Sequence, residues 1–268
     1  MILRSSDFCE DVKTHLGPEI RVVFDVGANF GQTTKLLSQH FPAARIYSFE
    51  PVEETYDHLI SNTHDLSGVE CFQIGFSDRP GTYEIFVQPH PGENSIEKNV
   101  DSGRGTTKIS LETIDSFCSR NGILKIDLLK TDTEGHDLCV LRGAQSMLDQ
   151  KCISAVYSEF GFYRDDRGHT NLCDLLYFMQ ANDYQLYNYY RIGSSFRDHP
   201  PYRDYPWANA LFIKNSIIRE IYADEYLEWL RKIGILPTAR TSGGAVPSSL
   251  PSWTKITSQL PLTRDSKA

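Results

Sequence analysis

Short apolar runs alternate with helix-like stretches along most of the chain, and this alternation limits the folds that are open to it. Predicted strands cover residues 20–26, 44–50, 69–77, 81–88, 125–132, 152–160, 184–190 and 207–214. Predicted helices cover residues 31–41, 52–63, 111–122, 136–150 and 171–182, with a short last helix at 217–233. A repeated strand–helix–strand order is typical of an α/β protein with a parallel, doubly wound sheet.

The composition limits the partners and the cellular location that we expect for such a domain. The net charge of -8 disfavours nucleic acid and anionic membranes as partners. The six cysteines form no C-x-x-C pair, so zinc is not indicated, and we expect a reducing, cytoplasmic location. No apolar run approaches the ~20 residues of a membrane span, so we expect neither a membrane span nor a signal peptide. We expect an N-terminal extension over 1–19, one globular domain over 20–235 and a flexible Pro/Ser/Thr-rich tail over 236–268.

A glycine turn follows the first predicted strand, in the sequence VVFDVGANFG. Ligands of open α/β sheets bind beyond the carboxyl ends of the strands, where this turn lies. The dinucleotide fingerprint G-x-G-x-x-G has a central glycine, whereas Asn29 stands between Gly27 and Gly31 here. Asp25, at the end of the strand, would repel a diphosphate and suits a ligand with an ammonium group. The alternative is a tight turn in which Asp25 and Asn29 cap the helix.

The second predicted strand ends at Glu50. An acidic residue at that place can accept hydrogen bonds from both hydroxyls of a ribose. The expected ligand therefore carries a ribose and a positive charge and lacks a diphosphate. S-adenosylmethionine satisfies all three conditions.

Four segments together resemble the FkbM-type S-adenosylmethionine-dependent methyltransferases: "VFDVGANFG", "YSFEP", "LKTDTEGHDLCVLRGA" and "NALFI". The resemblance implies a Rossmann-like class I methyltransferase sheet of seven mostly parallel strands with an antiparallel last strand, within the domain at 20–235. It also implies O-methylation of a saccharide or secondary metabolite. The expected cofactor-binding residues are Asp25, Gly27, Asn29 and Gly31 for the methionine part, Glu50 for the ribose, Gly75, Phe76, Ser77 and Asp78 for the adenine, and Lys130.

A hydroxyl is a weak nucleophile, so methyl transfer to it benefits from a general base. Asp132, Glu134 and His136 follow the strand predicted at 125–132, and Glu159 ends the next one. We expect these four residues to be catalytic, because they come from the same end of the sheet as the glycine turn. Helix capping is the alternative for Asp132, and an ordinary surface position is the alternative for His136.

Other interpretations remain open at this point. Asp132, Glu134 and Asp137 offer oxygen ligands to a divalent cation, and an ion could bridge Asp132 and Glu159, but our prediction includes no metal. An NAD(P)-dependent oxidoreductase shares the sheet and the acidic ribose contact, although Asn29 argues against it. A non-catalytic member would bind the cofactor or a partner protein without turnover. We expect the acceptor to contact the segments 89–107 and 187–207.

Overall fold

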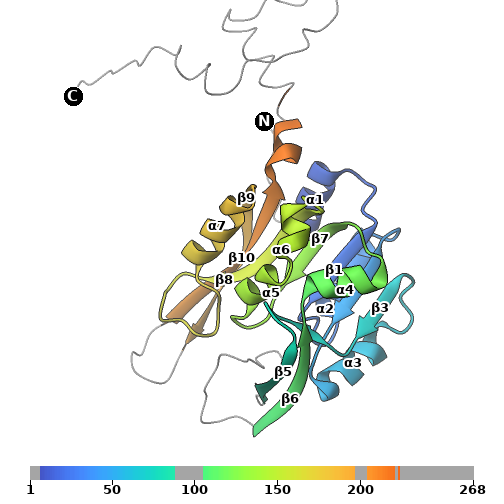
Figure 1. Ribbon diagram of the computed structural model, residues 1–268, viewed down its shortest axis with the longest axis vertical. Coiled ribbons are helices and arrows are strands. Elements are labelled where there is room, and N and C mark those ends of the chain that lie inside the picture. Colours follow the sequence, from blue (N-terminus) through green and yellow to red (C-terminus); the bar gives the residue numbers. More distant parts are fainter. Residues whose placement is uncertain (1–6, 88–104, 197–203, 221–222, 224–268) are drawn as a thin grey trace, which may run out of the picture. The chain divides into compact units, whose positions relative to one another are not determined.

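Seven strands form the main sheet of the computed structural model, which describes residues 7–87, 105–196, 204–220 and 223 (Figure 1). Their spatial order is β3-β2-β1-β7-β8-β10-β9. β3, β2, β1, β7 and β8 pair in parallel, and β10 runs antiparallel to both β8 and β9. The predicted sheet of mostly parallel strands with an antiparallel last strand is therefore confirmed. The bounds are β1 Val22–Val26, β2 Arg45–Phe49, β3 Val69–Phe72, β7 Ile126–Thr131, β8 Ile153–Gly161, β9 Tyr184–Phe196 and β10 Asp204–Lys214.

Helices cover both faces of this sheet, because successive side chains of a strand point to opposite faces. Phe24 and Leu129 belong to one buried apolar cluster, and their neighbours Val23 and Leu128 belong to another. The first cluster lies under α4, α5, α6 and α7, and the second under α1 and α2. The bounds are α1 Phe8–Leu16, α2 Gln32–His40, α3 Glu53–Thr63, α4 Ile114–Asn121, α5 Asp137–Arg142, α6 Gln145–Asp149 and α7 Leu172–Ala181.

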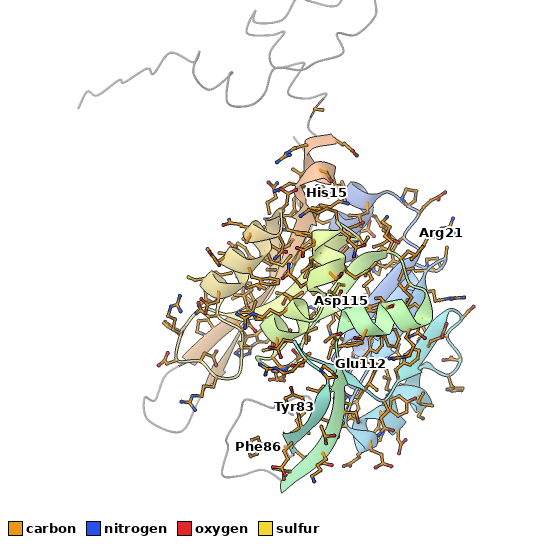
Figure 2. The ribbon with its side chains drawn as sticks, in the orientation of Figure 1. His15, Arg21, Tyr83, Phe86, Glu112 and Asp115 are labelled. Atoms are coloured by element: carbon orange, nitrogen blue, oxygen red, sulfur yellow. The ribbon has the colours of Figure 1, made fainter. Side chains whose placement is uncertain are left out.

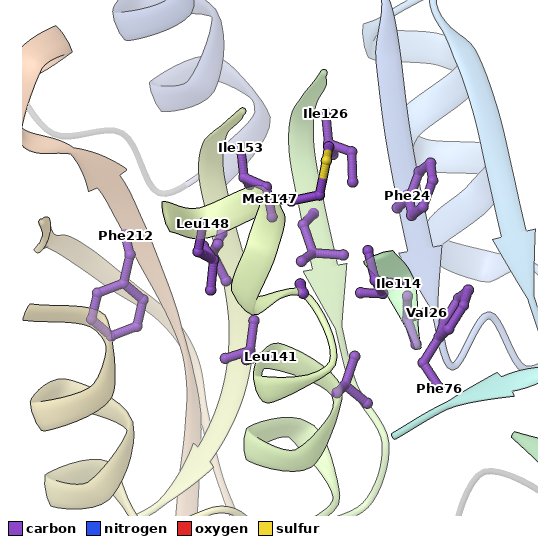
Figure 3. Packing of buried hydrophobic residues seen from close by; sticks show 14 of the residues in the cluster. Phe24, Val26, Phe76, Ile114, Ile126, Leu141, Met147, Leu148, Ile153 and Phe212 are labelled. Carbon is purple, nitrogen blue, oxygen red and sulfur yellow. The ribbon is translucent and has the colours of Figure 1, made fainter. Parts of the chain in front are cut away.

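The first cluster contains the larger share of the core. Figure 3 shows Leu141, Met147 and Leu148 of the short helices lying against Ile126 and Ile153 of the central strands. All except Met147 are fully buried. Burying one such side chain stabilises the fold by ~1.5–3 kcal/mol. β7 and β8 are thus tightly packed, and this packing fixes where the residues at their carboxyl ends lie.

The N-terminal helix α1 begins at an Asp7 cap, whose side chain accepts a hydrogen bond from the Cys9 N–H. Phe8 stacks on Tyr157 of β8 with ring centroids 3.9 Å apart. The Tyr190 hydroxyl donates a hydrogen bond to the buried Asp11 carboxylate. From residue 7 onward, the segment predicted as an extension before the domain is therefore packed against the same sheet.

A second, three-stranded sheet was not predicted. It has the order β4-β6-β5, formed by β4 Gly75–Phe76, β5 Gly81–Val87 and β6 Gly105–Glu112. The strand predicted at 69–77 is therefore two strands in two sheets. The predictions of a loop reaching residue 107 and of a helix from 111 were also wrong at their boundaries. Residues 105–111 pair with β5, and Glu112 pairs with Phe76 of β4.

Two further boundaries differ from the prediction. The helix predicted at 136–150 is α5 and α6, which are separated at Gly143 and Ala144. A side chain at Gly143 would place its Cβ 2.1 Å from the Ser77 carbonyl oxygen, so the backbones approach closely there. β9 and β10 both extend into the segment predicted as a connection, at 191–206. The tail at 236–268 and most of the loop at 89–107 lie outside the described residues.

Candidate active site

A cavity of about 440 Å³ lies beyond the carboxyl ends of β1, β2, β7 and β8. That volume is in the range of small-molecule sites. Ten of the predicted site residues line it: Gly27, Asn29, Glu50, Gly75, Phe76, Lys130, Asp132, Glu134, His136 and Glu159. The structure does not bring the other four, Asp25, Gly31, Ser77 and Asp78, into its lining.

The glycine turn after β1 forms one wall of the cavity. Gly27 and Ala28 both donate their N–H groups to the Phe49 carbonyl oxygen at 3.0 Å, which ties the turn to the end of β2. Gly27 has a φ of 74°, and a Cβ there would lie 1.9 Å from the Asp132 carbonyl oxygen. Only glycine allows the turn after β1 to approach the segment after β7 so closely.

Glu50, which follows β2, lines the cavity next to the glycine turn, and two backbone N–H groups hold its carboxylate. Its carboxylate oxygens accept hydrogen bonds from the Asn29 N–H at 3.1 Å and the Val52 N–H at 3.0 Å. Burial of the carboxylate raises its pKa to about 7, against the opposing effect of these hydrogen bonds. The Oδ1 atom of Asn29 is buried and meets no hydrogen-bond donor within the described part of the chain. A ligand in the cavity can supply that donor.

Asp25, which we predicted to lie by the methionine part of the cofactor, is buried outside the lining of the cavity. Its carboxylate is fully buried, accepts a hydrogen bond from the Thr34 hydroxyl at 2.7 Å and pairs with Lys130 Nζ at 2.9 Å. Lys130 also donates to the Gly27 carbonyl oxygen at 2.9 Å. Burial lowers the pKa of Lys130, but Asp25 and Asp132 outweigh that effect and raise it to about 12. Asp25 thus fixes a charged lysine, which in turn holds the glycine turn.

Gly31 and Ser77 are buried outside the lining, and Asp78 is exposed. Gly31 precedes α2 with a φ of 85° and no side-chain cap. The Ser77 hydroxyl lies 2.9 Å from His136 Nε2 and 3.2 Å from the Asp78 carboxylate. His136, at the start of α5, is buried rather than on the surface. This contact joins the segment after β4 to the start of α5.

The three-stranded sheet supplies an apolar wall that sequence reasoning missed. Ile85, Ile109 and Leu111 line the cavity beside Phe76. Figure 2 shows the side chains of this sheet, with Tyr83 and Phe86 of β5 labelled. The alternation of apolar residues in TKISL was the available signal for β6. Such a surface suits the flat face of an adenine ring.

Three carboxylates gather at the ends of β7 and β8, and we call Asp132, Glu134 and Glu159 the acid corner. One carboxylate oxygen from each lies within 4.8 Å of the others. Burial, followed by the nearby Asp132 and Glu134 charges, raises the pKa of Glu159 well above its usual range. Asp137, which the sequence placed with the first two, points elsewhere, and its Oδ1 accepts the Thr133 N–H at 3.3 Å.

Arg191 and Trp207 complete the lining from β9 and β10. Both belong to the segment 187–207, which we predicted to contact the acceptor, and the pairing of β9 with β10 places them at the cavity. Gly193 lies under the Trp207 ring, where an added Cβ would come 2.5 Å from Cζ2. The His169 ring lies on Trp207 with centroids 6.1 Å apart. Tyr187 and Tyr190, by contrast, are buried in the second cluster.

The strand order, the glycine turn after β1 and the acidic residue after β2 define a class I methyltransferase fold. Residues 25–186 match the methyltransferase FkbM domain, which is more than half of the chain. The chain therefore belongs to the FkbM methyltransferase family, whose cofactor is S-adenosylmethionine, and the resemblance noted in the sequence is confirmed.

Curated relatives share part of their length with the chain. Methyltransferase sdnD of Sordaria araneosa is 30% identical over 52% of this chain and 65% of its own. The 2-O-methyltransferase NoeI of Sinorhizobium fredii is 27% identical over 58% and 70%, respectively. The hexuronic acid methyltransferase AglP of Haloferax volcanii is 31% identical over 47% and 51%. The chain thus spans less than two thirds of the length of sdnD and about half that of AglP.

The described residues include no helix with the length and apolar character needed to cross a bilayer.

Proposed function

We propose that this chain is an O-methyltransferase that transfers a methyl group from S-adenosylmethionine to a hydroxyl of a saccharide or small metabolite. The observation that carries the proposal is the cavity itself, with Glu50 at one wall and the acid corner at another. The names of two relatives, a 2-O-methyltransferase and a hexuronic acid methyltransferase, favour an oxygen acceptor on a sugar. The net charge of -8 supports our expectation that the acceptor is not a nucleic acid.

The residues of the first wall fit the cofactor. Glu50, held by two backbone N–H groups, presents carboxylate oxygens to the ribose hydroxyls. The buried Asn29 Oδ1 atom would accept a hydrogen bond from an N–H group of the methionine part. Phe76, Ile85 and Leu111 provide the apolar surface for the adenine. Asp25 acts only through Lys130, which makes it a positioning residue.

The acid corner carries the chemistry at the acceptor. When bound, S-adenosylmethionine supplies a methyl carbon on a positively charged sulfur, which keeps the electron pair of the broken bond. A carboxylate of the acid corner accepts the proton that the acceptor hydroxyl loses. Glu159 has a pKa raised well above its usual range, which makes its carboxylate a stronger base than an exposed one. The corner lies at the ends of the buried strands β7 and β8, and positioning of the acceptor there would contribute a large share of the rate.

Two rival functions would leave the same fold intact. In a nicotinamide-dependent oxidoreductase, the glycine turn must admit a pyrophosphate, but the Asn29 side chain occupies that place. A non-catalytic member would retain the first wall and have no need of an acid corner. The three clustered carboxylates therefore favour an enzyme.

Calorimetric titration of the purified chain with S-adenosylmethionine, S-adenosylhomocysteine and NAD tests the first step. We expect both adenosyl compounds to bind and NAD not to bind. Transfer of a labelled methyl group to neutral and acidic saccharides then tests the second step. Binding of NAD alone would refute the proposal. Tight S-adenosylmethionine binding without transfer to any hydroxyl compound would favour the non-catalytic rival.

A further inference from the structure

The acid corner holds more negative charge than proton transfer requires. We propose that Asp132, Glu134 and Glu159 bind one divalent cation of the magnesium or manganese type, next to the site of the acceptor hydroxyl. The binding site stands on the geometry alone, whereas its part in catalysis rests on the proposed function. The sequence prediction included no metal, because the chain positions alone did not show that three carboxylates converge.

Geometry provides the first support. One oxygen from each of the three carboxylates lies within 4.8 Å of the other two. Oxygens on opposite sides of one Mg²⁺ ion are about 4.2 Å apart, since each Mg–O distance is about 2.1 Å. A small inward movement of three side chains therefore closes them around one ion. All three residues line the cavity, so waters and an acceptor oxygen can complete the coordination.

Glu159 provides the second, independent support. Only 7% of the residue is exposed, and its Oε2 atom accepts no hydrogen bond from the described residues. His169 Nε2 lies 3.8 Å from this oxygen, beyond hydrogen-bond distance, and the other ring nitrogen pairs with Asp166 at 2.7 Å. A buried carboxylate oxygen without a donor is costly unless a cation or a ligand satisfies it.

The neighbouring lysine does not neutralise the corner. Lys130 Nζ is 3.7 Å from the Asp132 carboxylate but only 2.9 Å from that of Asp25, which is completely buried. The positive charge of Lys130 is therefore paired mainly with Asp25 and compensates little of the negative charge of the acid corner. Oxygen ligands without sulfur or imidazole select a hard cation such as Mg²⁺, Mn²⁺ or Ca²⁺.

A cation at this place explains how a weak nucleophile is activated. A hydroxyl that coordinates a divalent ion loses its proton more readily, because the ion stabilises the alkoxide. The proton passes to a carboxylate oxygen of the acid corner that does not bind the ion, and from there to water. The carboxylates then act as metal ligands and proton acceptors with different oxygen atoms.

Titration of the chelator-treated chain with Mn²⁺, followed by electron paramagnetic resonance, tests the proposal without any acceptor. We expect one ion per chain and a weakening of at least about tenfold in Glu159→Gln, which removes one ligand charge. Glu70→Gln is the matched control, since Glu70 is an exposed carboxylate of β3, at the opposite edge of the sheet from β9. S-adenosylhomocysteine affinity in the same samples reports on folding.

The outcomes separate this proposal from the previous one. Absence of Mn²⁺ binding at millimolar concentration, or equal binding by wild type and Glu159→Gln, overturns the cation site. If S-adenosylhomocysteine still binds in that case, the proposed methyltransferase function stands. If Mn²⁺ binds as expected and a chelator leaves methyl transfer unchanged, the catalytic role of the ion is refuted and the site alone remains.

Discussion

The affinity for the cofactor should depend on pH through Glu50, and the structure sets the size of the effect. The ribose contact requires a carboxylate, and burial raises the pKa of this group to about 7. With that pKa, roughly nine tenths of Glu50 is ionised at pH 8 and roughly one tenth at pH 6. We therefore expect the affinity for S-adenosylhomocysteine to fall about tenfold from pH 8 to pH 6.

The free energy of unfolding should change with pH in the opposite direction: the affinity for the cofactor rises with pH, whereas the contribution of Glu50 to stability falls. Because the pKa of Glu50 is raised from 4.5 to about 7, the folded chain binds this proton more tightly than the unfolded chain. Its contribution is therefore fully favourable below pH 4.5 and is lost as the pH rises through 7. The loss attributable to this one group amounts to about 3 kcal/mol at most.

Calorimetry at pH 6, 7 and 8 in buffers of different ionisation enthalpy measures both the affinity and the protons released on binding. We expect nearly one proton released per chain at pH 6 and almost none at pH 8. Glu50→Gln is the matched control, because an amide keeps the shape and does not titrate. An affinity that is independent of pH in wild type, or an equal slope in Glu50→Gln, would refute the reasoning.

Three further predictions concern the surroundings of the cavity. Lys130→Met leaves the Asp25 charge buried and alone, so the free energy of unfolding measured by urea denaturation should fall by about 3–5 kcal/mol. The double variant with Asp25→Asn should recover much of that loss. An equal loss in the single and double variants would contradict a coupled pair. Gly27→Ala puts a Cβ 1.9 Å from the Asp132 carbonyl oxygen at a φ of 74°. We expect the free energy of unfolding to fall by more than about 1 kcal/mol and the cofactor to bind more weakly. An unchanged affinity for S-adenosylhomocysteine would show that binding does not need the close contact between the two backbone segments. Glu50→Ala should abolish cofactor binding while Asp132→Ala spares it and lowers turnover, measured by calorimetry and methyl transfer; equal loss of binding would remove Asp132 from the chemistry.

Much of the fold and of the cofactor wall follows from local sequence. The strand–helix alternation predicted β1, β2, β7 and β8 within one or two residues of their observed ends. Glu50 and the glycine turn were placed because a short apolar strand that ends in a polar residue puts that residue at the carboxyl edge of the sheet. The sequence did not show that Asp25 is buried outside the lining, because the side-chain period along a strand does not tell which face opens into a cavity.

Features that depend on pairing between segments far apart along the chain could not be predicted from the sequence. The strand at β5 was predicted, but its partner β6 was not; Gly81 pairs with Leu111 and Val87 pairs with Gly105. The sequence indicated the segment 187–207 only as a whole, and the pairing of β9 with β10 decides that Arg191 and Trp207 line the cavity. The acid corner had candidate members, but its convergence depends on the register of β7 with β8.

The sequence by itself determined the class of fold and the wall that we propose for the cofactor, because both rest on short-range patterns of apolar residues, glycine and acid. Only the tertiary structure decided which carboxylates meet, which aspartate is a buried counter-ion and what closes the apolar side of the cavity. The physical reason is that charge and burial act through space. A carboxylate acquires its raised pKa, its partner or its cation from residues that lie far away along the chain.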